Sequence, residues 1–297
     1  MMLPLILALI TAILFGISKV FIRLAVDVDP YASVLYTLLM GPPILLCFAL
    51  VNGDIFKTYN FNLWVMVNLA LAGAFQLAVG RIFAYSSIRL IGASRASQLT
   101  STQIVFAAIL GIMFLGENMT ITIGGGTLAI FLGELLISVS NPQQDGKSVF
   151  QPGNFRKGVA FGLIGGLIWG ASQLFAKEGT QSLGSPIIAS FFAYLFATVI
   201  QLVITCCLSR NKIKIELARS KYLFFSGIAS TIGLLSQYSA LKIEQVIWVT
   251  PIVNTSPLIT LLVSCAIMQR AELVNRKVVI GALMVVLGAL FVTVQKI

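Results

Sequence analysis

The chain has 297 residues, of which 58% are apolar and only 10% are charged. A soluble domain carries about 25% charged residues, so this composition excludes an ordinary soluble enzyme or binding domain and indicates a membrane protein. The formal net charge is +10, but the basic residues lie at the ends of apolar segments, where lipid headgroups account for them and no nucleic-acid partner is expected.

Ten apolar runs follow one another along the chain, and each has roughly the 20 residues that a membrane-spanning helix needs. The expected spans are residues 3–24, 31–51, 62–87, 93–115, 121–140, 157–177, 186–209, 221–242, 247–269 and 274–295. The first run carries Lys19 and Arg23 where a signal peptide has small neutral residues, so we expect a span. No segment alternates in polarity as a membrane β-barrel would. The sequence therefore predicts an all-α membrane protein with ten transmembrane helices.

The second half of the chain repeats the first at low identity. The matched positions share residue class and spacing: Phe15-Gly16 with Trp169-Gly170, Tyr85 with Tyr238, Gly126 with Gly281, and Gly133 with Gly288. We expect a first five-helix repeat at 1–140, a linker rich in Pro, Gly and Gln at 141–156, and a second repeat at 157–297. Because each repeat has an odd number of spans, the two must be inverted. Inverted repeats place a binding site between them near the membrane midplane and support alternating access.

Membrane orientation is predicted from the distribution of basic residues. Of the 20 Lys and Arg residues, two lie well inside spans, fourteen lie in loops after odd-numbered spans or at the span ends beside them, and four lie on the other side. These four are Lys57, Lys177, Lys242 and Lys296. The positive-inside rule then places the odd loops in the cytoplasm and both termini outside.

Three charged residues fall inside the expected spans: Lys19, Arg81 and Glu134. Each costs at least about 2.5–3.5 kcal/mol in the bilayer, so each needs a partner or a function. At about 1.5 Å per residue they lie roughly 6 to 12 Å inside the same side of the membrane, as one layer. We expect Glu134 to offset one cation and the other cation to attract an anionic group of a substrate. Glu134 is also the candidate coupling residue. Two alternatives stay open: Lys19 reaches the interface beside Arg23, and Arg81 and Glu134 form a structural ion pair.

The charge layer belongs to the first repeat alone. Its counterparts in the second repeat are uncharged: Gln173, Leu234 and Ala289. We therefore expect functional asymmetry to reside in this layer.

A polar stripe follows the fourth span, where Ser97 and Ser101 share one helix face. In the ninth span they correspond to Thr250 and Asn254, and Pro251 and Pro257 predict a kink or local unwinding there. We expect these four polar residues to orient a substrate. Close helix packing by small hydroxyl residues is the alternative. The tyrosines Tyr85 and Tyr238, from the neighbouring third and eighth spans, are expected to close the cavity.

One glutamate precedes the last span of each repeat: Glu117 and Glu272. A carboxylate at a turn before a helix caps free N–H groups and meets the positive end of the helix dipole, so we interpret both as caps. The four cysteines show no CxxC spacing and the chain has no His. We expect neither a disulfide nor a metal site, and no cofactor.

Two five-helix repeats, each with Gly116-Glu117 or Ala271-Glu272 before a Gly-rich fifth helix, resemble the EamA-like transporters of the drug/metabolite transporter superfamily. The resemblance covers the whole chain. It implies a ten-helix carrier of small metabolites, often an exporter of amino acids or related compounds, with a central cavity lined by helices 1, 3, 4 and their repeat partners. It also implies that both termini are cytoplasmic, which is opposite to the charge count.

Three function classes remain to be compared. An enzyme is not expected, because no catalytic motif and no nucleophile–base pair is present. A non-transporting scaffold would not need polar residues mirrored across the repeats. We predict a secondary transporter of the cell (plasma) membrane that exports an amino acid or related carboxylate-bearing compound. The alternative is a carrier of a drug, purine or nucleotide sugar. No Walker motif is present, so a proton gradient or an exchanged solute must drive transport.

Overall fold

The computed structural model describes residues 2–25, 30–91, 96, 99–140, 152–208, 217–268 and 276–294, and it is helical without any strand in these ranges. The helices of the first half are α1 (Met2–Leu24), α2 (Pro30–Leu39), α3 (Gly41–Val51), η1 (Asp54–Phe56), α4 (Leu63–Gly73), η2 (Ala74–Val79), α5 (Gly80–Ile91), α7 (Gln103–Leu115) and α8 (Ile121–Ser140). The second half contains α9 (Pro152–Leu183), α10 (Pro186–Leu208), α11 (Leu217–Ile243), α12 (Val246–Val253), α13 (Ser256–Met268) and α14 (Arg276–Val294).

Within the described ranges, seven helical segments are long and apolar enough to cross a membrane. They include α2 with α3 as Tyr31–Val51 and α4 with η2 and α5 as Leu63–Ser87. Two further apolar helices, Leu99–Leu115 and Ile121–Ile137, are shorter. The all-helical membrane architecture is thus confirmed, and the total of ten spans stays a prediction.

The sixth predicted span ends too early. We expected it to stop at residue 177 and Lys177 to lie in a loop, whereas α9 continues to Leu183. The helix continues because it packs on α4: a side chain at Gly179 would meet Leu69 at 2.6 Å. Lys177 is consequently a buried helical residue with 8% of its surface exposed.

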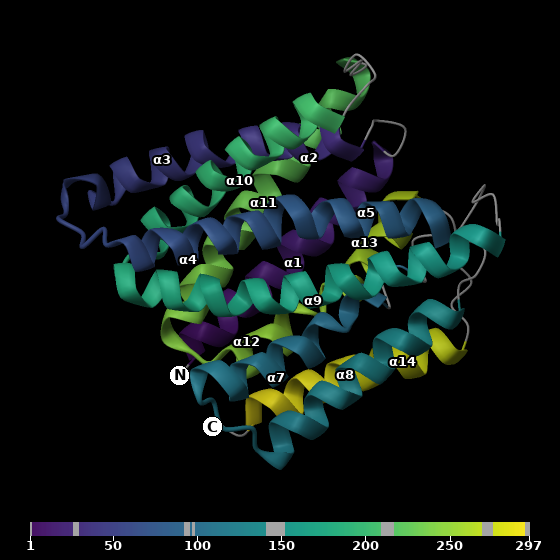
Figure 1. The fold of residues 1–297 in the computed structure, drawn as a ribbon. Coiled ribbons are helices and arrows are strands. Elements are labelled where there is room, and N and C mark those ends of the chain that lie inside the picture. Colours follow the sequence, from purple (N-terminus) through teal and green to yellow (C-terminus); the bar gives the residue numbers. More distant parts are fainter. Residues whose placement is uncertain are drawn as a thin grey trace.

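The helices pair as an inverted repeat requires. The first helix of each repeat packs on the third of the other, so α1 contacts α11 and α9 contacts α4 and α5, while α8 packs along α14 (Figure 1). The backbones of α8 and α14 also approach each other closely, at one matched glycine in each helix. A Cβ on Gly133 would meet the carbonyl oxygen of Gly281 at 2.6 Å, and one on Gly281 would meet that of Gly133 at 2.6 Å. The Gly-rich spans predicted from sequence therefore form the seam between the repeats, as small residues do in membranes.

Two helices are interrupted at equivalent positions. In the second repeat the chain leaves the helix after Val253 and resumes it at Ser256, and Pro251 and Pro257 flank this break. Proline has no N–H to donate and clashes with the preceding turn, which explains the predicted interruption. In the first repeat, Thr102 forms a turn directly before α7. This break was not predicted, because no proline marks it.

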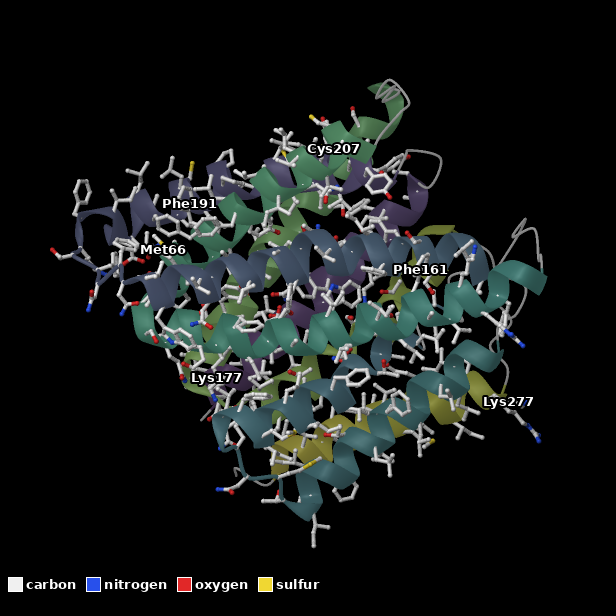
Figure 2. The ribbon with its side chains drawn as sticks, viewed as in Figure 1. Met66, Phe161, Lys177, Phe191, Cys207 and Lys277 are labelled. Carbon is white, nitrogen blue, oxygen red and sulfur yellow. The ribbon has the colours of Figure 1, made fainter. Side chains whose placement is uncertain are left out.

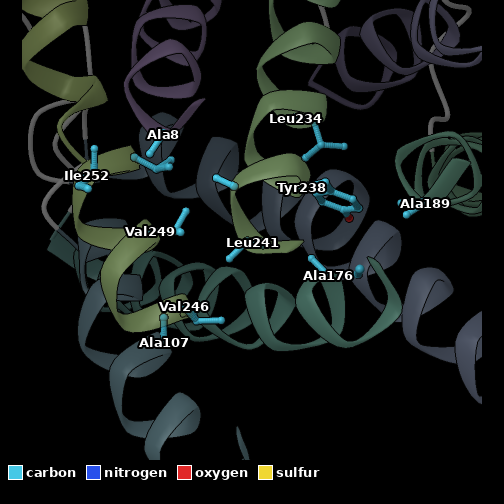
Figure 3. Close-up of a cluster of buried hydrophobic side chains, with 14 of the residues drawn as sticks. Ala8, Ala107, Ala176, Ala189, Leu234, Tyr238, Leu241, Val246, Val249 and Ile252 are labelled. Carbon is cyan, nitrogen blue, oxygen red and sulfur yellow. The ribbon is translucent and has the colours of Figure 1, made fainter. Parts of the chain in front are cut away.

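The hydrophobic core lies around α11 and α12. Figure 3 shows Leu234, Tyr238 and Leu241 of α11 beside Val246 and Val249 of α12. Every residue of α12 is buried. The short helix is thus held by packing on all sides, and its N-terminus is fixed inside the protein.

The bundle has two distinct ends. Both chain termini lie at the same end (Figure 1), which we call the terminal end, together with Lys177 (Figure 2). Lys277 lies at the opposite end (Figure 2), where α14 begins, and we call this the linker end. Lys19 and Glu134 lie toward the linker end, because they belong to the second halves of α1 and α8. Arg81 lies in the first turn of α5, beyond the middle of the third span.

At the terminal end, Asp54 joins the two repeats. Its carboxylate accepts hydrogen bonds from Lys57 Nζ at 2.6 Å and from Ser185 Oγ at 3.1 Å, and Ser185 also caps α10 through the N–H of Ile188. Burial acts to raise the pKa of Asp54, but the hydrogen bonds from Lys57 and Ser185 outweigh it, so the pKa lies below its ordinary value.

This contact predicts an acid-dependent stability. A carboxyl group whose pKa is depressed by folding stabilises the native state above its unfolded pKa, and this stabilisation is lost as pH falls through the folded value. We expect the thermal unfolding midpoint of the wild type to fall more steeply between pH 5 and pH 2.5 than that of Asp54→Asn. Parallel curves for the two proteins would show that Asp54 does not contribute.

Candidate functional site

The two helix breaks meet through a pair of side-chain amides. Gln103 Nε2, at the start of α7, donates to Asn254 Oδ1 at 2.5 Å. Asn254 Nδ2 donates to the Thr250 carbonyl oxygen at 2.9 Å. Asn254 is 4% exposed and its amide is hydrogen-bonded on both sides. The side chain therefore ties the break of the second repeat to that of the first.

Lys19 projects from the inner face of α1. It lies two turns after Ala12, so it projects from the face that carries the buried residues Ala8 and Ala12. The lipid-facing side of α1 carries Ile6 and Ile13 instead. Nevertheless Lys19 is exposed. Its Nζ donates to Ser256 Oγ at 2.9 Å, at the start of α13. The ammonium thus points to the break in the ninth span.

Glu134 is buried without a partner in the described part of the chain. It forms no ion pair with Lys19 there, and both of its carboxylate oxygens lack a hydrogen-bond partner among the described residues. Ser101 lies beside the carboxylate, with a geometry that falls short of a hydrogen bond. Glu134 is 5% exposed. Within the described residues Glu134 thus forms an ion pair with neither cation, and the structural pair with Arg81 is not formed.

Arg81 remains as the second cation of the layer. Its Nη1 donates to Thr37 Oγ1 at 3.3 Å, and within the described residues it forms no ion pair with an acid. Tyr85 lies one turn further along α5, and both side chains are half-buried. The guanidinium of Arg81 and the phenol of Tyr85 therefore lie one turn apart, and both side chains are partly accessible to solvent.

Toward the terminal end, a ring of amides fills the space between the helices. Gln76 Nε2 donates to Gln237 Oε1 at 2.7 Å, and Gln237 Nε2 donates to Gln173 Oε1 at 2.8 Å. Trp169 Nε1 closes the ring by donating to the Gln76 carbonyl oxygen at 3.1 Å. All three glutamines are at most 8% exposed. The ring joins the third, sixth and eighth spans and seals this half of the interior.

The ring depends on a widened turn. Gln76 lies in the π-helix η2, a form that is rare and often occurs at functional sites. A side chain on Gly80 would overlap the Trp169 indole, so glycine is needed where that ring packs. The three glutamines were not among the residues predicted from sequence, although amides inside apolar spans are costly to bury and could have been singled out by that cost.

Glu117 joins the repeats at the terminal end. Its carboxylate accepts from Lys177 Nζ at 2.6 Å and from the backbone N–H groups of Val246 and Ile247 at 2.8 and 2.9 Å. Glu117 caps a helix, but this helix is α12 of the second repeat. The helix that follows Glu117, α8, is capped by Thr120 Oγ1, which accepts from the Ile123 N–H at 3.4 Å. The prediction that Glu117 caps the helix it precedes is therefore wrong, and Glu272 lies outside the described residues.

The comparison with protein families decides the identity of the fold. The model of the EamA-like transporter family matches residues 2–139 and 156–294, which is nearly the whole chain in two copies. The chain belongs to the EamA-like transporter family.

A solved structure has the same fold as this chain. The structure, titled "Crystal structure of protein", superposes with a TM-score of 0.80 over 98% of this chain and 96% of that chain, at 14% sequence identity. At this identity the likeness shows the fold alone. No match is found among curated proteins. As an EamA-like transporter, the chain is a multi-pass membrane protein of the drug/metabolite transporter superfamily with a small-molecule substrate.

The residues expected to bind substrate in this EamA-like chain fall into three groups. Lys19, Arg81, Tyr85, Ser101 and Glu134 lie toward the linker end. Asn254 lies at the break of the ninth span, and Thr250 lies one turn before it with its hydroxyl unbonded within the described part of the chain. Tyr238 is fully buried in the apolar core, where no described residue bonds its hydroxyl, away from any accessible space. Ser97 lies outside the described residues.

Metal ligation has no structural support in the described part of the EamA-like chain. No group of three or more Cys, Asp or Glu side chains that could hold an ion is found there.

Proposed function

We propose that this EamA-like chain is a ten-span secondary transporter of the plasma membrane that exports an amino acid or a related carboxylate-bearing metabolite by alternating access. The observation that carries the proposal is the charge of the layer near the linker end. Lys19 and Arg81 contribute two positive charges and Glu134 one negative charge, so one cation is in excess. A cation held between helices, where the local dielectric constant is below that of water, attracts an anionic group more strongly than the same charge does in bulk water.

The substrate carboxylate fits the pair of Arg81 and Tyr85. A guanidinium presents its N–H donors in a fork that matches a carboxylate, and within the described residues only one hydrogen bond, to Thr37, holds this one. Lys19 supplies the second cation. We assign Ser97, Ser101, Thr250 and Asn254 the role of orienting the remainder of the substrate, and Tyr238 that of an apolar wall on the sealed side.

Alternating access is supported by the difference between the two ends. The amide ring and the contacts of Glu117 and Lys177 close the terminal half, whereas Lys19 is exposed and Arg81 is half-buried. The conformation is therefore one in which a substrate enters from the linker end. Opening of the terminal end requires separation of the two repeats along contacts that are polar and hence replaceable by water.

A binding screen tests the proposal. Purified protein in detergent is heated with a library of metabolites, and the unfolding midpoint is recorded for the wild type and for Arg81→Gln. A carboxylate compound should raise the midpoint of the wild type and have a smaller effect on Arg81→Gln. Stabilisation by lipophilic or quaternary ammonium cations alone would contradict the proposal and favour the drug-carrier alternative.

A further inference from the structure

The hydrogen bonds between the three glutamines of the amide ring run in one direction. Gln173 Nε2 donates to the Trp169 carbonyl oxygen at 3.4 Å, and a carbonyl oxygen can only accept. Gln173 Oε1 therefore faces Gln237, whose Nε2 donates to it at 2.8 Å. Gln237 Oε1 in turn accepts from Gln76 Nε2 at 2.7 Å. The backbone carbonyl at one end thus decides the orientation of all three amides.

The other end of this chain of amides is an acceptor without a donor. Gln76 Oε1 is buried and no described residue donates to it, and the whole residue is only 8% exposed. Turning the amide over would place its oxygen against Gln237 Oε1, which is also an acceptor. A buried acceptor without a donor is destabilising. The group that would satisfy Gln76 Oε1 is an N–H or O–H donor of a ligand.

Gln76 lies on the same face of the third span as Arg81 and Tyr85. The Gly80 N–H donates to the Phe75 carbonyl oxygen, and a bond to the fifth residue before is that of a π-turn. Residues five apart lie above one another in such a turn, so Gln76 is one turn from Arg81. Tyr85 follows Arg81 by one ordinary turn of α5. An amide oxygen, a guanidinium and a phenol therefore form one row along the helix.

We propose that Gln76 Oε1 binds the ammonium group of a zwitterionic α-amino acid whose carboxylate is held by Arg81 and Tyr85. The inference rests on the proposed function and narrows its substrate class to carboxylates that carry an adjacent amine. An ammonium has three donors and no acceptor, which is the partner that Gln76 Oε1 needs. A carboxylate and an amine joined through one carbon fit two side chains one helical turn apart, about 5.4 Å along the axis.

A neutral acceptor suits this position better than an acid. A carboxylate one turn from Arg81 would pair with its guanidinium and compete with the substrate, whereas the Gln76 amide leaves the guanidinium available. The ammonium of an amino acid stays beside its own carboxylate, so the molecule brings no net charge to Arg81. Because Gln76 Oε1 is covered by its neighbours, binding of the ammonium includes a small movement of the side chains around it.

Matched pairs of ligands test the role of the amine. Wild-type protein is heated with each protein amino acid and with the same acid without its α-amine, such as alanine and propionate, and affinities are taken from the unfolding midpoints. At least one amino acid should bind about 10- to 150-fold more tightly than its partner, the range for a hydrogen bond to a charged group. Its trimethylammonium analogue, which keeps the charge but has no N–H, should bind no better than the amine-free acid. Absence of any such preference, or of any binding, would overturn the inference.

Two variants assign the preference to one residue. Gln76→Met removes the acceptor at nearly constant length, so the amino acid should fall to the affinity of its amine-free partner, whose own affinity should change little. Gln201→Met is the matched control, because it removes a fully buried glutamine of α10 that is bonded to Tyr31 and Thr205; it should keep the preference. A preference that persists in Gln76→Met would overturn the inference. If this variant does not fold, Gln76→Asn, which withdraws the amide by one methylene, is measured with the same expectation.

Failure of the proposed function has a separate signature. If amine-free acids bind as tightly as amino acids and Arg81→Gln loses both, the carboxylate site stands and the role of Gln76 is overturned. If alaninamide, which has the amine but no carboxylate, stabilises the wild type and not Gln76→Met, while propionate stabilises neither, the role of Gln76 stands and the assignment of a carboxylate to Arg81 fails.

Discussion

Glu117→Gln should lower the free energy of unfolding by about 3–5 kcal/mol, the cost of removing one partner from a buried ion pair. The substitution leaves the Lys177 ammonium uncompensated with 8% of its surface exposed. It also weakens the cap on α12, because a neutral amide oxygen accepts less strongly than the carboxylate that now binds the N–H groups of Val246 and Ile247. The effect is large because a single side chain joins three helices from both repeats.

Two variants separate the contributions of the ion pair and the cap. Lys177→Met removes the cation but leaves Glu117 bound to two backbone N–H groups, so its loss should be smaller. Lys57→Met removes a cation whose side chain is 62% exposed and leaves Asp54 its hydrogen bond from Ser185, so it should lower the unfolding midpoint less than Glu117→Gln. Unfolding is followed by helicity in detergent micelles. Equal midpoints for Glu117→Gln and Lys57→Met would show that the buried pair does not hold the repeats together.

Asn254→Ala should weaken substrate affinity about 5- to 150-fold, which corresponds to about 1–3 kcal/mol for a buried group that loses its hydrogen-bond partner. The substitution leaves the Gln103 amide, held at 2.5 Å, without its acceptor. Because Gln103 is half-buried, its freed side chain would move within the space where a substrate is expected. The protein should remain folded, since α12 stays packed on all sides.

A double-mutant cycle tests this connection. If Gln103 and Asn254 act together, the effects of Gln103→Ala and Asn254→Ala on affinity should not add, and the coupling should be about 0.5–3 kcal/mol. Additive losses would separate the two residues. Normal transport by Asn254→Ala, together with loss of transport from apolar changes on the opposite face of the ninth span, would show that the polar stripe serves packing.

The sequence predicted the features that repeat. Gly133 and Gly281 match in spacing, and they form the reciprocal contact between α8 and α14. Pro251 and Pro257 predicted the break of the ninth span because proline cannot donate a backbone hydrogen bond. Glycine spacing and proline positions act on the backbone where they occur, so they predict close helix packing and a helix break with little knowledge of the rest of the chain.

Contacts between distant residues could not be predicted in the same way. Glu117 is recognisable as a cap from its turn, but its capped helix begins at Val246, which only the packing of one repeat on the other brings near. The amide ring of Gln76, Gln173 and Gln237 has no counterpart in the opposite half, so comparison of the repeats gives no hint of it. Thr37 was likewise missed as the partner of Arg81, because it is a small hydroxyl in an apolar span.

Part of the charge layer was predicted and part was not. The depth of Lys19 and Glu134 followed from helix geometry, and the structure brings both side chains to the same region. Their relation was left open, since depth alone does not say which cation faces the acid. The rotation of α1 about its axis directs Lys19 toward Ser256, and within the described residues neither cation forms an ion pair with Glu134.

The claim that an excess cation selects an anionic substrate is tested most directly by transport in liposomes. Wild-type protein and Arg81→Gln are reconstituted, and uptake of a labelled carboxylate from the binding screen is compared with uptake of its neutral amide analogue by exchange. The wild type should prefer the carboxylate, and Arg81→Gln should lose transport of the carboxylate while transport of the amide changes little. Equal losses for both compounds, or a wild-type preference for the amide, would contradict the account.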